Sequence, residues 1–93
     1  MKYDVKFTSR FKKDYRLARK RGLDISALDQ IVETLANGQT LPDECHDHPL
    51  IGNYGGCREC HITPDWLLIY KIFESVLVLE LSRTGTHSDL FGK

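Results

Sequence analysis

Long apolar runs are absent from this sequence of 93 residues. No segment approaches the roughly 18 apolar residues that a membrane-spanning helix needs. The first residues, Met1-Lys2-Tyr3-Asp4 and then Lys6, also lack the apolar core of a secretory signal peptide. These two absences predict a cytoplasmic protein that has no membrane partner.

Cysteine is scarce, and its count of three is odd. In a chain without an export signal, an odd count argues against a disulfide framework. The run Cys57-Arg58-Glu59-Cys60-His61 nevertheless matches the C-x-x-C-H pattern of c-type haem attachment and overlaps redox and zinc patterns. Met1 is the only methionine, so the chain offers no internal methionine as an axial haem ligand.

Two further observations weaken the redox and metal interpretations of this run. Thioredoxin-like cysteine pairs begin a helix, whereas residues 57–63 alternate as a strand does. Cys45, His46 and His48 could be recruited to zinc, but a second ligand pair at zinc-finger spacing is missing. The sequence therefore predicts no metal and no cofactor.

Net charge is also missing, because 13 Lys and Arg balance 13 Asp and Glu. The balance hides a separation: residues 1–21 hold nine basic and two acidic residues, a local charge of +7, and residues 22–93 carry −7. A basic segment of this density can follow a phosphate backbone, since each neutralised phosphate releases a counterion. A solvated helix face is the alternative interpretation.

The composition that is present, 41% apolar and 28% charged, fits one globular domain over residues 1–93. Residues 2–8 alternate polar and apolar side chains, which predicts a half-buried strand. A helix capped by Ser9 and ending at Gly22 is expected next. Its apolar stripe should face the core. Its outward face is basic and consists of Lys12, Lys13, Arg16, Arg19 and Lys20.

A second helix is expected to begin near Asp24 or Ser26 and to end at Asn37-Gly38. The two helices should form a hairpin that covers one face of a sheet. Residues 39–56 lack periodicity and are rich in Pro and Gly, which predicts a long loop. The leucines of this loop, Leu41 and Leu50, suggest that it packs against the domain.

Three strands are predicted in the second half, at residues 57–63, 66–73 and 76–83. The middle one is apolar on both faces, as a central strand should be. Glu74-Ser75 is expected as a short hairpin connection, and the tail should contain a turn and a short helical turn. The predicted architecture is β-α-α-β-β-β.

The turn between the first two of these strands is predicted at Pro64-Asp65. Proline presets φ in such a turn, and aspartate can bond back to its own backbone. His61 and Asp65 should therefore face each other at one end of a hairpin. By alternation, His61 shares a face with Glu59 and Cys57. If the helices cover the opposite face, a substrate can reach His61.

Three more side chains, those of His48, Arg83 and His87, are predicted to converge with His61 and Asp65 on a phosphate group. RNA cleavage without a metal needs a base for the 2′-hydroxyl, an acid for the leaving 5′-oxygen and a cation for the transition state. Histidine suits both proton transfers, because its unperturbed pKa of about 6.5 lies near the working pH. Arginine suits the third task, because its permanently charged fork matches phosphate oxygens. The residues alone indicate a nuclease or a phosphate-binding protein.

Simpler interpretations exist for each of these residues. A single histidine is more often exposed or hydrogen-bonded than catalytic. Arg83 could form a surface ion pair with Glu80 or Asp65, and Asp65 could serve the turn alone. Trp66 and Phe91 could belong to the core or its rim, although aromatic rings at an RNA site can stack on unpaired bases.

Residues 47–50, 52–61, 64–71 and 83–92 contain His-Pro-Leu, Pro-Asp-Trp and Arg-Thr-Gly-Thr-His-x-x-Leu-Phe. This spaced set is far more specific than any of its parts. It resembles the YafQ-type toxins of the RelE/ParE superfamily, and the similarity spans nearly the whole chain. The resemblance implies an α+β fold with a small, mainly antiparallel twisted sheet and a helical hairpin on one face.

The resemblance also implies a ribosome-dependent endoribonuclease of a type II toxin–antitoxin system that cuts mRNA in the ribosomal A site. The expected partners are the 70S ribosome, mRNA and a cognate antitoxin, in a heterotetramer or larger complex. Binding of rRNA is expected to fall to the five basic residues of the first helix. The functional positions that carry over are His48, His61, Asp65, Arg83 and His87, with Trp66 and Phe91 lining the site.

The implied mechanism is attack of the 2′-hydroxyl on the adjacent phosphate, which gives a cyclic phosphate and a free 5′-hydroxyl. His87 is the expected general acid, with Asp65 and His61 as the base or its orienting partner. His48 and Arg83 are expected to hold the scissile phosphate and stabilise its developing charge.

Two other functions stay open. A ParE-like relative would bind a protein such as DNA gyrase without catalysis, and it would have no chemical need for the five functional positions. A free-standing nuclease would cut naked RNA, although the concentrated positive charge fits rRNA better. The sequence leaves the codon preference open, and relatives suggest adenine-rich lysine codons.

Overall fold

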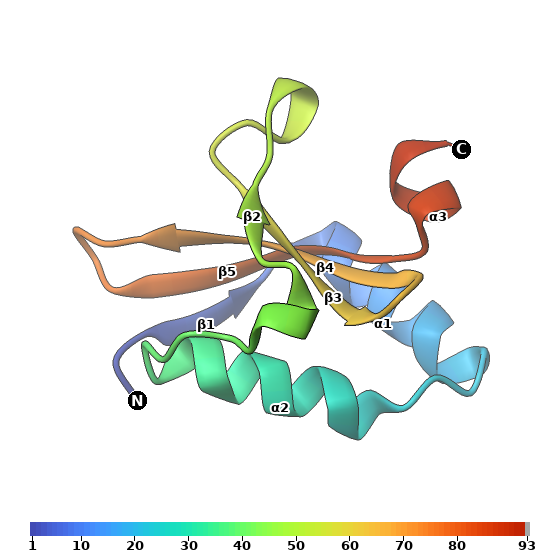
Figure 1. Cartoon of the computed structure of the whole chain (residues 1–93), viewed down its shortest axis with the longest axis horizontal. Helices are drawn as coiled ribbons and strands as arrows, with labels where there is room; N and C mark the ends of the chain where they lie inside the picture. The colour runs from blue at the N-terminus through green and yellow to red at the C-terminus, as the bar shows by residue number, and fades with distance from the viewer. Residues whose placement is uncertain (93) are drawn as a thin grey trace.

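The computed structural model describes residues 1–92, which form a five-stranded sheet with two longer helices and one short helix. In chain order the elements are β1 (Asp4–Phe7), α1 (Ser9–Lys20), α2 (Ile25–Ala36), a 3₁₀ turn (Asp43–Cys45), β2 (His48–Pro49), a 3₁₀ turn (Gly52–Tyr54), β3 (Arg58–Thr63), β4 (Trp66–Phe73), β5 (Val78–Gly85) and α3 (His87–Phe91). The strands lie in the order β1-β5-β4-β3-β2 (Figure 1). Among the described strands only β1 and β5 pair in parallel, so the predicted α+β fold with a mainly antiparallel sheet is confirmed.

The two faces of the sheet are covered by different elements (Figure 1). Phe11 of α1 and Leu28 of α2 pack with Leu68 of β4 in the main buried cluster. On the opposite face, Leu90 of α3 packs on Leu67 in a smaller cluster. None of the helices within residues 1–92 is long and apolar enough to cross a membrane. The face on which α3 and the loop segment pack is the one that carries the predicted site.

The cap of the first helix lies one residue earlier than predicted. Ser9 is its first helical residue, and Thr8 is the cap. The Thr8 hydroxyl accepts a hydrogen bond from the Phe11 N–H at 3.0 Å and donates one to the Ser82 carbonyl at 2.7 Å, so the cap also ties α1 to β5. Of the two starts predicted for the second helix, Asp24 and Ser26, Asp24 is the cap of α2.

The last strand differs from its prediction by two residues, since β5 covers Val78–Gly85 and not 76–83. The connection is a four-residue turn that includes Val76 and Leu77, which are 65% and 46% exposed. Leu77 has a φ of 53°, which a strand residue does not adopt. The apolar character of these two turn residues produced the error.

The segment predicted as a loop, residues 39–56, contains β2 and two 3₁₀ turns. The short strand β2 pairs with β3 and adds a fifth strand to the four that the sequence predicted. Leu41 is buried in the main cluster, and Leu50 packs against the smaller one. The prediction that this segment packs against the domain is therefore confirmed. The prediction that it lacks regular structure is wrong.

Candidate functional site

Strand register gathers the predicted site residues on the open face of the sheet. Glu59 of β3 pairs with His48 of β2 on one side and with Ile69 of β4 on the other, and Ile69 pairs with Arg83 of β5. Residues that pair across neighbouring strands project to the same face. His61 lies two residues further along β3, so it shares this face, as predicted.

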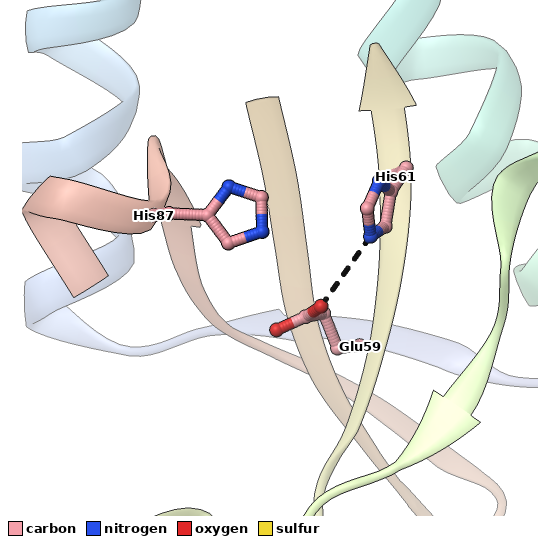
Figure 2. A group of neighbouring side chains, drawn as sticks. All are labelled: Glu59, His61 and His87. Atoms are coloured by element: carbon pink, nitrogen blue, oxygen red, sulfur yellow. Dashed lines mark ion pairs between the residues drawn. The ribbon is translucent and has the colours of Figure 1, made fainter. Parts of the chain in front are cut away.

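His61 and His87 come together although they are 26 positions apart in the sequence. Their ring centroids lie 5.8 Å apart, and the two rings are tilted edge to face. Figure 2 shows them on either side of Glu59, with His87 projecting from the start of α3 and His61 from β3. The side chain of His61 is 22% exposed and that of His87 is 46% exposed, so solvent reaches both.

Asp65 faces His87, and this corrects the prediction that it faces His61. The Nδ1 atom of His87 lies 2.6 Å from Oδ1 of Asp65, and the His87 backbone N–H donates to the same oxygen at 3.1 Å. These two hydrogen bonds lower the pKa of Asp65. A carboxylate that accepts from Nδ1 leaves Nε2 of His87 available to a substrate.

The position of His87 is fixed by the start of α3. Thr86 and Asp89 form a capping box, in which each side chain accepts a hydrogen bond from the other residue's backbone N–H. Arg21, just after α1, donates to Asp89 at 2.7 Å, and this hydrogen bond lowers the pKa of the Asp89 carboxyl to about 2. Asp89 therefore stays ionised at neutral pH and keeps α3 tied to α1.

The position of His48 is fixed by hydrogen bonds of the neighbouring residues. The neighbouring Asp47 accepts hydrogen bonds from the Tyr70 hydroxyl at 2.7 Å and from Arg58 Nε at 3.2 Å. Nδ1 of His48 lies 2.6 Å from the carbonyl oxygen of His46. The ring of His46 also contacts the His61 ring, with a centroid distance of 5.4 Å.

Arg83 is held by residues that the sequence interpretation did not assign to it. Its Nε and Nη2 atoms donate to Asp14 of α1 at 2.6 and 3.1 Å, and Nη1 donates to the Tyr54 hydroxyl at 3.2 Å. The expected ion pair with Glu80 or Asp65 is thus replaced by one with Asp14. This partner raises the pKa of Arg83, whose side chain is 11% exposed.

The two aromatic residues predicted to line the site lie in different environments. Trp66 is 2% exposed in the main core, and its indole N–H donates to the Thr84 hydroxyl at 2.9 Å. The ring lies beneath the sheet with the helices, so stacking of Trp66 on RNA would require the ring to leave the core. Phe91 is 39% exposed, and its ring meets that of Tyr54 at 5.9 Å on the open face.

The basic face of α1 is arranged as the sequence predicted. All five of the residues expected to contact rRNA are exposed, namely Lys12, Lys13, Arg16, Arg19 and Lys20. Their exposure leaves the charges free to contact a large anionic surface.

The positions of Cys57 and Cys60 argue against the haem and redox interpretations. Cys60 is buried in the main core, whereas Cys57 packs with the smaller cluster on the other face. Two sulfur atoms on opposite faces of the sheet cannot hold a common group. A different set, Glu59, His61 and His87, could hold a metal ion, because one ligand atom from each lies within 4.8 Å of the others.

Glu59 and Tyr54 are the site residues that the sequence interpretation missed. Glu59 was predicted only to share a face with His61, and a glutamate inside a strand has no motif of its own. Tyr54 lies in a segment without periodicity, so no spacing connected it with Arg83.

A family profile described as "Bacterial toxin of type II toxin-antitoxin system, YafQ" matches residues 3–92 of this chain. The chain belongs to the YafQ family. The mRNA interferase toxin YafQ of Escherichia coli K12 is 42% identical over 90 residues, which are 96% of each chain.

Solved structures of YafQ relatives share this fold. The E. coli DinJ–YafQ complex matches with a TM-score of 0.89 at 41% identity, covering 97% of this chain and 99% of that one. A metal-bound toxin from Helicobacter pylori matches with a TM-score of 0.90 at 39% identity, covering 96% and 99%. At this identity and coverage, the resemblance stated from sequence motifs is confirmed at the level of the family.

Proposed function

We propose that this YafQ-family toxin is an endoribonuclease that cuts mRNA on the ribosome by metal-independent attack of the 2′-hydroxyl. The observation that carries the proposal is the pair of imidazole rings 5.8 Å apart, one of them anchored on a carboxylate. Two imidazole groups in this arrangement can serve as base and acid on opposite sides of one phosphate. The mRNA interferase name of the E. coli relative supports the same activity.

Under this proposal, His87 is the general acid and His61 the general base. Asp65 accepts from Nδ1 of His87, so Nε2 can carry the proton that the leaving 5′-oxygen takes. Since Asp65 is engaged with His87, it acts as the orienting partner of the acid, and His61 remains to take the proton of the 2′-hydroxyl. Each proton transfer is worth about 10² to 10⁴ in rate.

Arg83 and His48 would hold the phosphate. A guanidinium carries five N–H donors, and the bonds to Asp14 and Tyr54 use three of those of Arg83. The remaining N–H donors can bind phosphate oxygens. The three donors that bond to Asp14 and Tyr54 hold the guanidinium in a fixed orientation. Preorganised charge of this kind stabilises a transition state without reorganisation during the reaction.

The H. pylori relative makes metal binding a question for this chain as well. Glu59, His61 and His87 offer the nitrogen and oxygen ligands that zinc or copper prefers. A metal held there would bind ring nitrogens that the two histidines use for proton transfer. We therefore propose that bound metal inhibits the nuclease.

Primer extension on a defined mRNA tests this function. The mRNA is incubated with the toxin either alone or on translating ribosomes, and each arm is repeated with added Zn²⁺ and with a chelator that is selective for zinc and copper and leaves Mg²⁺ on the ribosome. We expect in-frame cuts only with ribosomes, unchanged by the chelator and slowed by Zn²⁺. Loss of cutting with the chelator would contradict the metal-free mechanism. Equal cutting of naked RNA would indicate a free-standing nuclease, and no cutting by folded protein would favour a non-catalytic toxin.

We also propose that a cognate antitoxin docks in a groove between β1, α1 and α2. The groove has a volume of about 700 Å³ and is lined by apolar residues that include Phe7 and Phe11. Arg16 and Arg19 of the basic face lie along it. A partner with apolar and acidic side chains would fit both features and would cover the charges proposed to bind rRNA. Antitoxin and ribosome would then compete for α1.

Replacing Phe7 with glutamate should weaken antitoxin binding at least about 10-fold, because burying a phenylalanine side chain is worth about 1.5 to 3 kcal/mol. Phe7 is 53% exposed, so the free toxin should tolerate the change. Val76→Glu is the matched control, since Val76 is 65% exposed on the β4–β5 turn, away from the groove. Affinity for the antitoxin encoded beside the toxin is measured by calorimetry. Equal affinities of both variants would place the antitoxin elsewhere.

A further inference from the structure

We propose that Glu59 is a positioning residue of the nuclease site, which holds the imidazoles of His61 and His48 in their working orientation. The inference rests on the proposed function and adds a residue to it. Oε1 of Glu59 lies 3.6 Å from Nε2 of His61 and 3.6 Å from Nε2 of His48. One carboxylate oxygen is therefore shared by two histidines that come from different strands.

The surroundings of Glu59 give its carboxylate no other charged partner. Its side chain is 6% exposed, and within residues 1–92 it forms no ion pair with lysine or arginine. Burial of an ionised carboxylate is costly unless the charge is paired. The two imidazoles are the groups that can supply this pairing, so the contribution of Glu59 lies in its contact with them and not in stability.

The backbone of Glu59 is fixed from both sides, which suits a positioning role. It pairs with His48 of β2 and with Ile69 of β4 in the antiparallel ladder. His61 extends from the same strand, and His87 approaches from α3 (Figure 2). A group held by two neighbouring strands can fix a ring more accurately than one on a loop.

The distance of 3.6 Å is longer than a hydrogen bond, whose usual limit is about 3.2 Å. Catalytic hydrogen bonds are often long in the free enzyme and shorten in the complex. When a phosphate enters between the histidines and one of them takes a proton, its attraction to Glu59 increases. The carboxylate then draws the ring into line and stabilises the charge that the ring gains as the base.

Glu59→Gln is the variant that tests this role, because glutamine keeps the size of the side chain and loses the charge. We expect ribosome-dependent cleavage to slow about 10- to 100-fold, since a misplacement of about 1 Å can cost about 100-fold. The concentration of programmed ribosomes that gives half-maximal rate should not change. The melting temperature should stay the same or rise, because an uncompensated buried charge is removed.

Two further readouts separate this role from a purely structural one. The pH–rate profile of Glu59→Gln should change shape, and the side-chain NMR signals of His61 and His48 should shift in the free protein. Glu80→Gln is the control, because Glu80 lies on β5 and accepts from Ser82. Cleavage by Glu59→Gln at the unmodified rate, or a loss of rate matched by a lower melting temperature, would overturn the inference. Absence of cleavage by the unmodified protein would instead refute the proposed function.

Discussion

Cleavage of ribosome-bound mRNA by the His87→Ala protein is expected to be about 10² to 10⁴-fold slower than by the unmodified protein. The alanine removes the imidazole that we assign as the acid for the leaving 5′-oxygen. The fold should persist, because the capping box of Thr86 and Asp89 does not involve the His87 ring. Single-turnover primer extension with excess toxin measures the chemical step.

Ser88→Ala is the matched control for this variant, since Ser88 is the next residue of α3 and is exposed. Asp65→Asn is informative beside it. It keeps a hydrogen-bonding oxygen near Nδ1 of His87 but removes the charge, so we expect a smaller loss than for His87→Ala. If His87→Ala folds and cuts at the unmodified rate, the acid must be another group, and the anchored pair of histidines loses its significance.

The sequence predicted which side chains of β3 lie on the open face, because side chains alternate between the two faces along any strand. His61 on β3 was expected to share a face with Glu59, and the structure places the two side chains together on the open face. The same reasoning could not find the fifth strand, because β2 has only two residues, His48 and Pro49. Two residues are too few to show a period, and β2 exists through its pairing with β3.

The wrong predictions of side-chain partners, for Asp65 and Arg83, have a different origin. Asp65 was expected to face His61 across the turn, since these residues are close in sequence. Its partner is His87, which the tail brings back across the sheet after β5. Arg83 likewise pairs with Asp14, 69 positions away in the sequence. Such contacts depend on how α1 and α3 pack, and no pattern of spacing records this packing.

Trp66 illustrates how a residue that carries a family resemblance can also belong to the core. Its position beside Pro64-Asp65 made it part of the motif that indicated the YafQ family. In the structure its ring is 2% exposed and donates a hydrogen bond to Thr84, whose hydroxyl donates in turn to the Leu67 carbonyl at 2.7 Å. These contacts join β4 to β5 beneath the site.

Trp66→Ala is accordingly expected to lower the free energy of unfolding by about 3 to 5 kcal/mol, the usual range for a buried tryptophan. The free energy of unfolding of such domains is only about 5 to 15 kcal/mol, so this variant should have a much lower melting temperature. Trp66→Phe keeps a ring in the core and loses the hydrogen bond to Thr84, which should cost about 1 to 3 kcal/mol. Urea unfolding followed by circular dichroism measures both changes.

Phe91→Ala is the counterpart that separates packing from RNA contact. Phe91 is 39% exposed beside Tyr54, so its loss should change stability little. Base stacking on an aromatic ring is worth about 1 to 3 kcal/mol, which predicts cleavage about 5- to 150-fold slower. Trp66→Phe, assayed below its melting temperature, should cut at the unmodified rate. If it folds and loses as much activity as Phe91→Ala, Trp66 must leave the core to reach RNA on the ribosome, and its contacts with Thr84 must open during the reaction.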